Sequence, residues 1–209
     1  MNIQEYSKPK IPVKVSKEVN KHLSNPNYNP NRNEYALSKL LRNLGWQLLS
    51  LDGYFSDVYG NPNKDYILKI NKRPDSAYNA YVALIKKSNN PHFSKISDLK
   101  VLNIKGQKYY IYLIEKLDVL YVLNIDGDDY YADLIRLFND IIRYPNDNIF
   151  TSRYPTEILQ YMQKNPKLLQ AIKIISKYYY KSSGISLDLH GNNMMKRNDG
   201  TLVITDPFS

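Results

Sequence analysis

Apolar and polar residues follow a strand-like pattern in the middle of the chain. Short stretches rich in β-branched and aromatic residues, bounded by Gly, Pro, Asn and Asp, predict five strands at residues 46–51, 55–59, 65–70, 99–104 and 109–114. Turn residues separate several of them, namely Asp52-Gly53, Gly60-Asn-Pro-Asn63 and Lys105-Gly106. One helix is predicted at residues 75–88, between the third and fourth strands. Tight turns join antiparallel neighbours, so the pattern predicts an antiparallel sheet with one inserted helix.

The pattern becomes helical after residue 127. Apolar residues recur there at a spacing of three and four, which is typical of helices with one buried face. Three helices are predicted, at residues 128–143, 156–163 and 166–181. A group of strands followed by a group of helices favours the α+β class.

The residues before the sheet have a different composition. Residues 1–34 contain four prolines among Asn and Lys, and they predict a loosely ordered arm with one short helix near residues 16–23. Helical spacing over residues 33–44 predicts a second helix, which Gly45 ends. The expected division is an arm at 1–34, a sheet domain at 35–117 and a helical domain at 118–209.

Oxygen-bearing side chains recur in the last quarter of the chain. Asp188 is followed by Asn193 and then by Asp206. Between the last two, Asn198-Asp199-Gly200 predicts a tight turn and residues 202–205 predict a short strand that ends at Asp206. Such a hairpin brings all three side chains to one place. Mg²⁺ prefers oxygen ligands and takes few of them from protein, so this segment predicts a site for magnesium and phosphates.

Composition restricts the alternatives. The 209 residues contain no Cys and only three His, which excludes disulfides and thiolate metal sites and disfavours zinc. No stretch is apolar enough for a membrane span and the N-terminus has no signal-peptide core, so a cytoplasmic protein is expected. The net charge of +9 comes from dispersed lysines, and this does not favour nucleic acid as the main partner.

The segment Leu187-Asp-Leu-His-Gly-Asn-Asn-Met-Met-Lys-Arg-Asn-Asp-Gly-Thr-Leu-Val-Ile-Thr-Asp-Pro resembles the catalytic and metal-binding loops of the protein-kinase-like fold. Within that fold, the chain is similar to the short serine/threonine protein kinases of T7-like bacteriophages, over roughly residues 46–209. The resemblance implies a bilobal α+β architecture. Its N-lobe is a five-stranded antiparallel sheet with one helix, and its reduced, mainly helical C-lobe carries the catalytic hairpin.

The resemblance also implies roles for individual residues. Asp188 matches the base that takes the acceptor's proton, and Asn193 and Asp206 match the Mg²⁺ ligands. His190 stands where aminoglycoside phosphotransferases also have His, in reach of the γ-phosphate, and Lys69 matches the lysine that holds the α- and β-phosphates. The remaining ATP-binding positions are a degenerate glycine loop and a hinge, represented by Gly53, Ser56, Val58, Glu115 and Leu117.

Two departures from the family pattern are visible. The helix predicted after Lys69 has no Glu to pair with it, and Asp75 is the nearest acid. The sequence ends three residues after Asp206, where kinases continue with an activation segment. We therefore expect self-association or a bound partner near residues 128–181, with the arm as a further candidate to cover that region.

The expected function is a Mg²⁺- and ATP-dependent phosphotransferase, a phage-encoded protein Ser/Thr kinase that modifies host proteins. The alternative is a kinase-like protein that binds and inhibits a host target with little or no catalysis. His190 leaves a small-molecule acceptor open.

Overall fold

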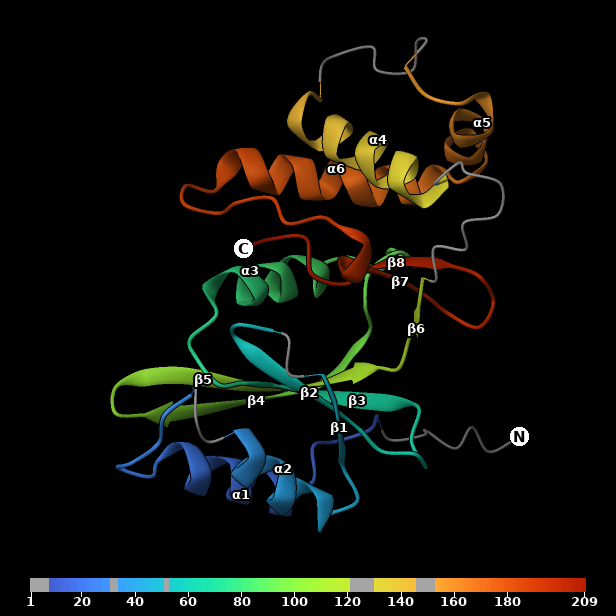
Figure 1. Ribbon diagram of the computed structural model, residues 1–209. Helices are drawn as coiled ribbons and strands as arrows, with labels where there is room; N and C mark the ends of the chain where they lie inside the picture. The colour runs from blue at the N-terminus through green and yellow to red at the C-terminus, as the bar shows by residue number, and fades with distance from the viewer. Residues whose placement is uncertain (1–7, 31–33, 51–52, 121–129, 146–152) are drawn as a thin grey trace, which may run out of the picture. The chain divides into compact units, whose positions relative to one another are not determined.

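The computed structural model describes residues 8–30, 34–50, 53–120, 130–145 and 153–209 (Figure 1). The chain divides into two compact units. The first comprises Met1–Asp75 and Lys95–Lys116, and the second comprises Ser76–Ser94 and Leu117–Ser209. Residues 1–7 and 31–33 of the predicted arm, Asp52, and residues 128–129 of a predicted helix lie outside the described residues. No described helix has the length and apolar character that crossing a membrane requires.

The first unit contains the predicted five-stranded antiparallel sheet, so the α+β class is confirmed. The strands lie in the order β1-β2-β3-β5-β4. Their bounds are β1 Gln47–Ser50, β2 Ser56–Gly60, β3 Tyr66–Asn71, β4 Ile96–Ile104 and β5 Gln107–Glu115. Lys105 and Gly106 both have positive φ, 50° and 79°, and join β4 to β5 in a two-residue turn. The predicted hairpin at this position is confirmed.

Two helices, α1 Val13–Leu23 and α2 Glu34–Arg42, cover one face of this sheet (Figure 1). Helix α1 is longer than predicted and begins three residues earlier than the predicted Ser16. Its side chains Val15, Val19 and Leu23 are almost completely buried in a core shared with the sheet. Upstream of α1, the Ile11 N–H donates to Asp98 Oδ2 over 2.9 Å and ties the start of the segment to β4. The described part of the N-terminal segment is therefore an integral layer of the sheet unit.

The second unit contains the other helices of the described residues. They are α3 Ser76–Ile85, α4 Tyr130–Arg143, α5 Thr156–Lys164 and α6 Pro166–Lys181. The three predicted C-terminal helices are thus present, and α4 packs on both α5 and α6. Helix α3 groups with this unit rather than with the sheet, which differs from the expected boundary at residue 117.

A small sheet completes the second unit, with strand order β6-β7-β8. Its strands are β6 Asp118–Val119, β7 Met194–Lys196 and β8 Leu202–Ile204. The segment after α3 lies across β8: the His92 ring bonds the Leu202 carbonyl over 2.8 Å, and Phe93 forms a bridge with Ile204. Tyr81 of α3 donates its hydroxyl proton to the Ile204 carbonyl. These contacts hold α3 and its following loop against the C-terminal hairpin.

Candidate active site

The β7–β8 hairpin places Asn193 beside the residues that precede Asp206. Met194 pairs with Ile204, and the Thr205 N–H donates to the Asn193 carbonyl over 2.9 Å. The turn has the predicted chemistry, because Gly200 has a φ of 83° and Asp199 accepts from the Thr201 N–H over 2.9 Å. That hydrogen bond lowers the pKa of the Asp199 carboxyl. Asn193 and Asp206 therefore stand at the same open end of the hairpin.

The residues after Asp206 return along the loop that carries Asp188. The Asp188 N–H donates to the Pro207 carbonyl over 2.9 Å, and Leu187 forms an antiparallel bridge with Phe208. Ser186 and Ser209 exchange two backbone hydrogen bonds, of 2.8 and 3.0 Å. This pairing brings Asp188 next to Asp206, and together with the hairpin it gathers the three predicted oxygen side chains in one backbone network.

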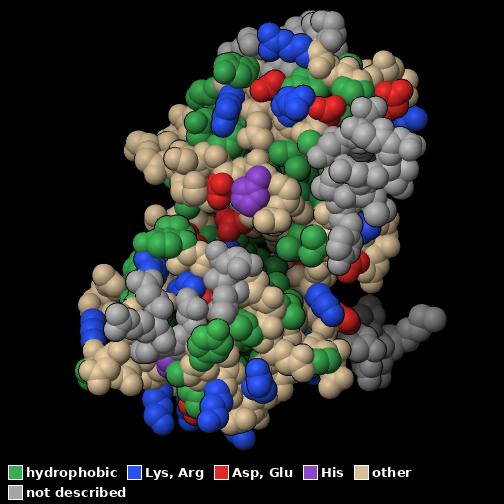
Figure 2. Space-filling view, viewed as in Figure 1, with side chains coloured by type: hydrophobic (Ala, Val, Ile, Leu, Met, Phe, Trp, Pro, Cys, Tyr) green, Lys and Arg blue, Asp and Glu red, His purple; other side chains and the backbone are tan. Residues whose placement is uncertain are grey.

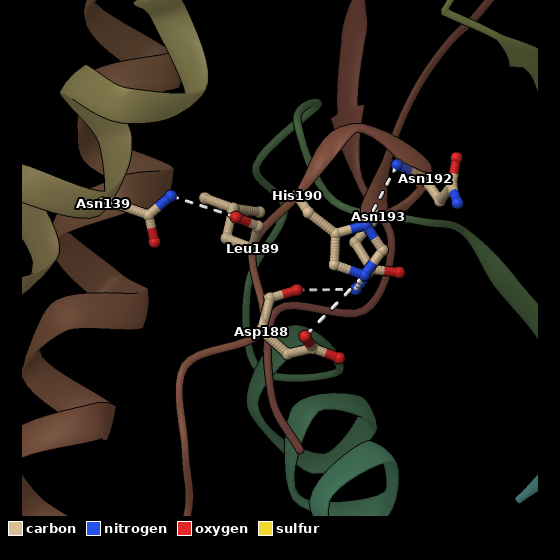
Figure 3. A network of polar contacts seen from close by, with 6 residues as sticks. All are labelled: Asn139, Asp188, Leu189, His190, Asn192 and Asn193. Atoms are coloured by element: carbon tan, nitrogen blue, oxygen red, sulfur yellow. Dashed lines mark hydrogen bonds and ion pairs between the residues drawn. The ribbon is translucent and has the colours of Figure 1, made fainter. Parts of the chain in front are cut away.

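Side chains of the 188–193 loop are joined by a local polar network (Figure 3). Asn193 Nδ2 donates to the Asp188 carbonyl over 2.6 Å and also lies 3.0 Å from His190 Nε2. The Asn192 N–H donates to His190 Nδ1 over 3.3 Å, and His190 Nε2 lies 3.7 Å from Asp188 Oδ1. The side chains of Asp188 and His190 are 46% and 51% exposed, which leaves both accessible to a ligand.

One residue that supports this loop was not predicted from the sequence. Asn139 Nδ2, on α4, donates to the Leu189 carbonyl over 3.0 Å and to the Ile135 carbonyl of its own helix over 2.9 Å (Figure 3). Leu189 is itself buried. Asn139 therefore anchors the backbone between Asp188 and His190. Nothing local in the sequence distinguishes it from the chain's many other asparagines.

The donor set fits a magnesium ion that is shared with phosphates. With its Nδ2 committed to the Asp188 carbonyl, the Oδ1 of Asn193 has no hydrogen bond to any described residue. Asp206 supplies a carboxylate at the adjoining position. Among the described residues, no three His, Asp or Glu side chains are grouped closely enough to hold a metal by themselves. One amide oxygen and one carboxylate suit Mg²⁺, which keeps water and phosphate in its other positions.

Two of the predicted ATP-binding residues of the first unit, Val58 and Lys69, lie on the sheet face opposite to the core. Leu68 and Ile70 belong to the core, so Lys69 between them points to the other face. Val58 and Tyr112 pair with Lys69 on either side and share that face. The structure therefore places Val58, Lys69 and Tyr112 on the same surface.

The glycine loop and the hinge have more specific geometry. A Cβ on Gly53 would lie 2.6 Å from the Ser56 carbonyl oxygen, so the close turn into β2 requires glycine there, while Ser56 is buried.

At the hinge, the Glu115 N–H donates to the Lys95 carbonyl and its carboxylate accepts from the Lys95 N–H over 2.7 Å. The boundary between the two units falls directly before Leu117. Its N–H has no hydrogen bond to a described residue, so it is the open donor of the predicted hinge.

Helix α3 confirms the first departure from the kinase pattern. Its ten residues, Ser76–Ile85, include no acid. Asp75 lies immediately before the helix and is 6% exposed.

Helix α3 also contacts the last residues of the chain. Tyr81 and Phe208 form an edge-to-face contact, with ring centroids 6.5 Å apart. Aromatic packing and the Tyr81 hydroxyl thus attach α3 to the end of the chain.

A groove borders Asp188 within the second unit. It has a volume of about 600 Å³ and lies between α4 and residues 187–191. Asn139, Asp140 and two arginines of α4 line one side, while Asp188 and His190 line the other. Acidic and basic side chains are interspersed over the α4 region of the face shown in Figure 2. The groove is large enough for several residues of a polypeptide.

No protein-family model and no curated protein matches the chain. Among solved structures, the chain is similar to the kinase PK-1 of Cydia pomonella granulovirus, at 16% sequence identity and a TM-score of 0.39. The match covers 81% of this chain and 56% of that structure, so the chain spans a little over half of its length. A likeness at this level does not assign an activity.

Proposed function

We propose that the chain is a Mg²⁺- and ATP-dependent phosphotransferase, a phage-encoded protein Ser/Thr kinase acting on proteins of its bacterial host. The observation that carries the proposal is the backbone network that gathers Asp188, Asn193 and Asp206. Asp, Asn and Asp in this order are the base and the two metal ligands of protein kinases. The open Oδ1 of Asn193 and the half-exposed Asp188 carboxylate provide the accessible oxygens that these roles need.

In this proposal, Asp188 accepts a hydrogen bond from the acceptor hydroxyl and takes its proton as the new O–P bond forms. The bond between the γ-phosphorus and the bridging oxygen breaks, and ADP leaves with the bonding electrons. The His190 side chain contacts a γ-phosphate oxygen. Asn193 and Asp206 hold magnesium, which neutralises phosphate charge when it is bound. Lys69 pairs with the α- and β-phosphates.

The second candidate is a kinase-like protein that binds and inhibits a host target without phosphate transfer. The absence of an acid from α3 favours it, because kinases use a helix Glu to orient the strand lysine. The two candidates differ in two measurable properties. A kinase must bind Mg²⁺·ATP and transfer its γ-phosphate, whereas an inhibitor needs neither step.

The test combines nucleotide binding with radiolabel transfer. The purified chain is incubated with Mg²⁺·[γ-³²P]ATP and bacterial lysate, next to Asp188→Asn and the control Asp199→Asn in the exposed turn. We expect Asp188→Asn to lower labelling about 10²–10⁴-fold, the usual contribution of a general base, and Asp199→Asn to leave it unchanged. Mg²⁺·ATP should stabilise the wild type by about 2.7 kcal/mol at 100 times its Kd. No stabilisation at millimolar nucleotide would favour the inhibitor.

A further inference from the structure

We propose that the groove beside Asp188 binds an acidic polypeptide segment as the phosphate acceptor, with Arg136 and Arg143 of α4 reading its carboxylates. This inference rests on the proposed function and specifies its substrate class. The groove lies entirely within the second unit, and it joins the proposed base, Asp188, to a row of charged side chains. Its shape and charge therefore bear directly on which acceptors reach Asp188.

One face of α4 forms a side of the groove. Arg136, Asn139, Asp140 and Arg143 follow one another at steps of three, one and three residues, which keeps them on the same side of a helix. Asn139 is occupied in holding the Leu189 carbonyl. The arginines flank it, one helical turn before and one after. Arg136 and Arg143 therefore lie on either side of Asn139, the residue that anchors the loop.

The charges along this face are not equally available. Asp140 accepts a hydrogen bond from the Tyr154 hydroxyl, which engages its carboxylate. Arg136 forms an exposed pair with Asp133, with Nη1 and Oδ1 2.8 Å apart and the two side chains 67% and 28% exposed. Exposed pairs of this kind contribute little, so Arg136 can turn to another carboxylate at small cost. No described acidic side chain pairs with Arg143. The groove therefore offers two cations to a ligand.

The spacing of the arginines suits an extended peptide. Arg143 lies seven positions after Arg136, which is about 10 Å along a helix axis. An extended chain advances roughly 3.3 Å per residue, so the arginines would meet carboxylates about three residues apart. A Ser or Thr hydroxyl is neutral and can approach the Asp188 carboxylate without repulsion. An acceptor segment with acidic residues at this spacing thus matches both sides of the groove.

Other acceptors fit less well. A nucleic-acid backbone needs a continuous positive track, but Asp140 and Asp188 line the same groove. Carboxylates at intervals, separated by neutral residues, match this mixed lining better than a uniform polyanion does.

The test measures peptide binding without nucleotide, so that it does not depend on catalysis. A fluorescent peptide with a central Ser and Glu at every third position is compared with a peptide that has Lys in place of each Glu. Fluorescence anisotropy should show the acidic peptide binding about ten-fold more tightly or better. The affinity should fall as salt rises, because the pairs are exposed.

Charge reversal provides the decisive variant. In Arg136→Glu/Arg143→Glu we expect the preference to invert in favour of the Lys peptide, a gain that misfolding cannot produce. The matched control, Lys173→Glu/Lys177→Glu, changes the net charge equally on exposed positions of α6 and should keep the acidic preference. Equal binding of both peptides, or no inversion, would overturn the inference. So would a single-stranded oligonucleotide that displaces the acidic peptide more effectively than unlabelled peptide does.

The two proposals fail in different ways. If the acidic peptide is not preferred but Mg²⁺·ATP-dependent labelling is intact, the proposal of an acidic acceptor is rejected and the kinase proposal stands. If the peptide binds through the arginines but no phosphate is transferred, the kinase proposal is rejected. The groove is then the surface with which this chain, acting as an inhibitor, binds its target.

Discussion

In the first unit, the side chains that build the core and two of those predicted to contact ATP, Val58 and Lys69, lie on opposite faces of the sheet. Leu68, Ile70 and Leu113 pack under α1 and α2, whereas Val58 and Lys69 point the other way. The second unit has no such separation. Met194 directly follows Asn193, Ile204 lies two residues before Asp206, and both are completely buried.

This difference has consequences for mutation. In the first unit, a change under the helices can lower stability without altering the residues on the opposite face. In the second unit, β7 and β8 belong to the core and also position the metal ligands, so stability and ligand binding should change together. Trp46 is the only tryptophan and is buried in the first unit, so its fluorescence reports unfolding of that unit. Hydrogen exchange of α6 reports on the second unit.

The largest stability effect should come from the buried ion pair of the first unit. Lys72 Nζ lies 3.0 Å from Asp57 Oδ1, and their side chains are 9% and 3% exposed. Removing one partner of a buried pair typically costs about 3–5 kcal/mol, so Lys72→Met should lower the urea midpoint of Trp46 fluorescence strongly. Asp57→Leu/Lys72→Met should recover most of the loss. If the double variant is less stable than the single one, the cost does not come from a buried unpaired charge.

A slightly smaller effect is expected from the core beneath α2. Leu41 is fully buried, and Leu41→Ala should destabilise the first unit by about 2–5 kcal/mol through lost burial and a cavity. Leu49→Ala is the matched control, because Leu49 is 57% exposed. Exchange of α6 should stay unchanged in both variants. Faster α6 exchange in Leu41→Ala would show that the two units do not unfold independently.

Tyr81→Phe tests the coupling expected in the second unit. The variant removes the Tyr81 hydroxyl from the buried Ile204 carbonyl, and loss of a hydrogen bond to a buried acceptor costs about 1–3 kcal/mol. Because Ile204 is two residues from Asp206, we also expect weaker Mg²⁺·ATP binding in a thermal-shift titration. Tyr144→Phe, at a tyrosine that is 53% exposed, serves as the control. Reduced stability with unchanged nucleotide affinity would contradict the coupling.

The smallest effect should appear as a pH dependence that differs between the units. Burial lowers the pKa of His22 in the first unit and of His92 in the second below the ordinary 6.5, and Arg197 and Lys167 add to the effect at His92. The unfolded chain then binds more protons than the native state. Each histidine's contribution is therefore complete above pH 6.5 and is lost as the pH falls from 6.5 toward the lowered value.

Glutamine substitutions separate the two contributions. His22→Gln should flatten the pH dependence of the Trp46 transition between about pH 7 and 5, and His92→Gln should flatten only that of α6 exchange. The two variants could instead change the pH dependence of Trp46 fluorescence and of α6 exchange to the same extent. That result would mean that each histidine affects the stability of both units.

Much of the secondary structure could be predicted because its signals are local. Helical spacing located α4, α5 and α6, and turn residues located the hairpins at Lys105-Gly106 and Asn198–Gly200. The prediction missed β6, since its two exposed residues carry no apolar alternation. It also shortened α1, because Pro9 and Pro12 suggested an open arm, although Pro12 serves as the residue before the first turn of the helix.

The sequence by itself determined most of the helices and strands, the order of Asp188, Asn193 and Asp206, and the turn that brings Asn193 close to Asp206. Each depends on residues near one another in the chain, where dihedral preferences and spacing act directly. Only the tertiary structure decided the pairing of residues 186–188 with 207–209, the attachment of α3 through Tyr81, and the support of the Asp188 loop by Asn139. These contacts join distant segments mainly through backbone carbonyls. Every residue has a carbonyl, so no side-chain pattern marks which ones will meet.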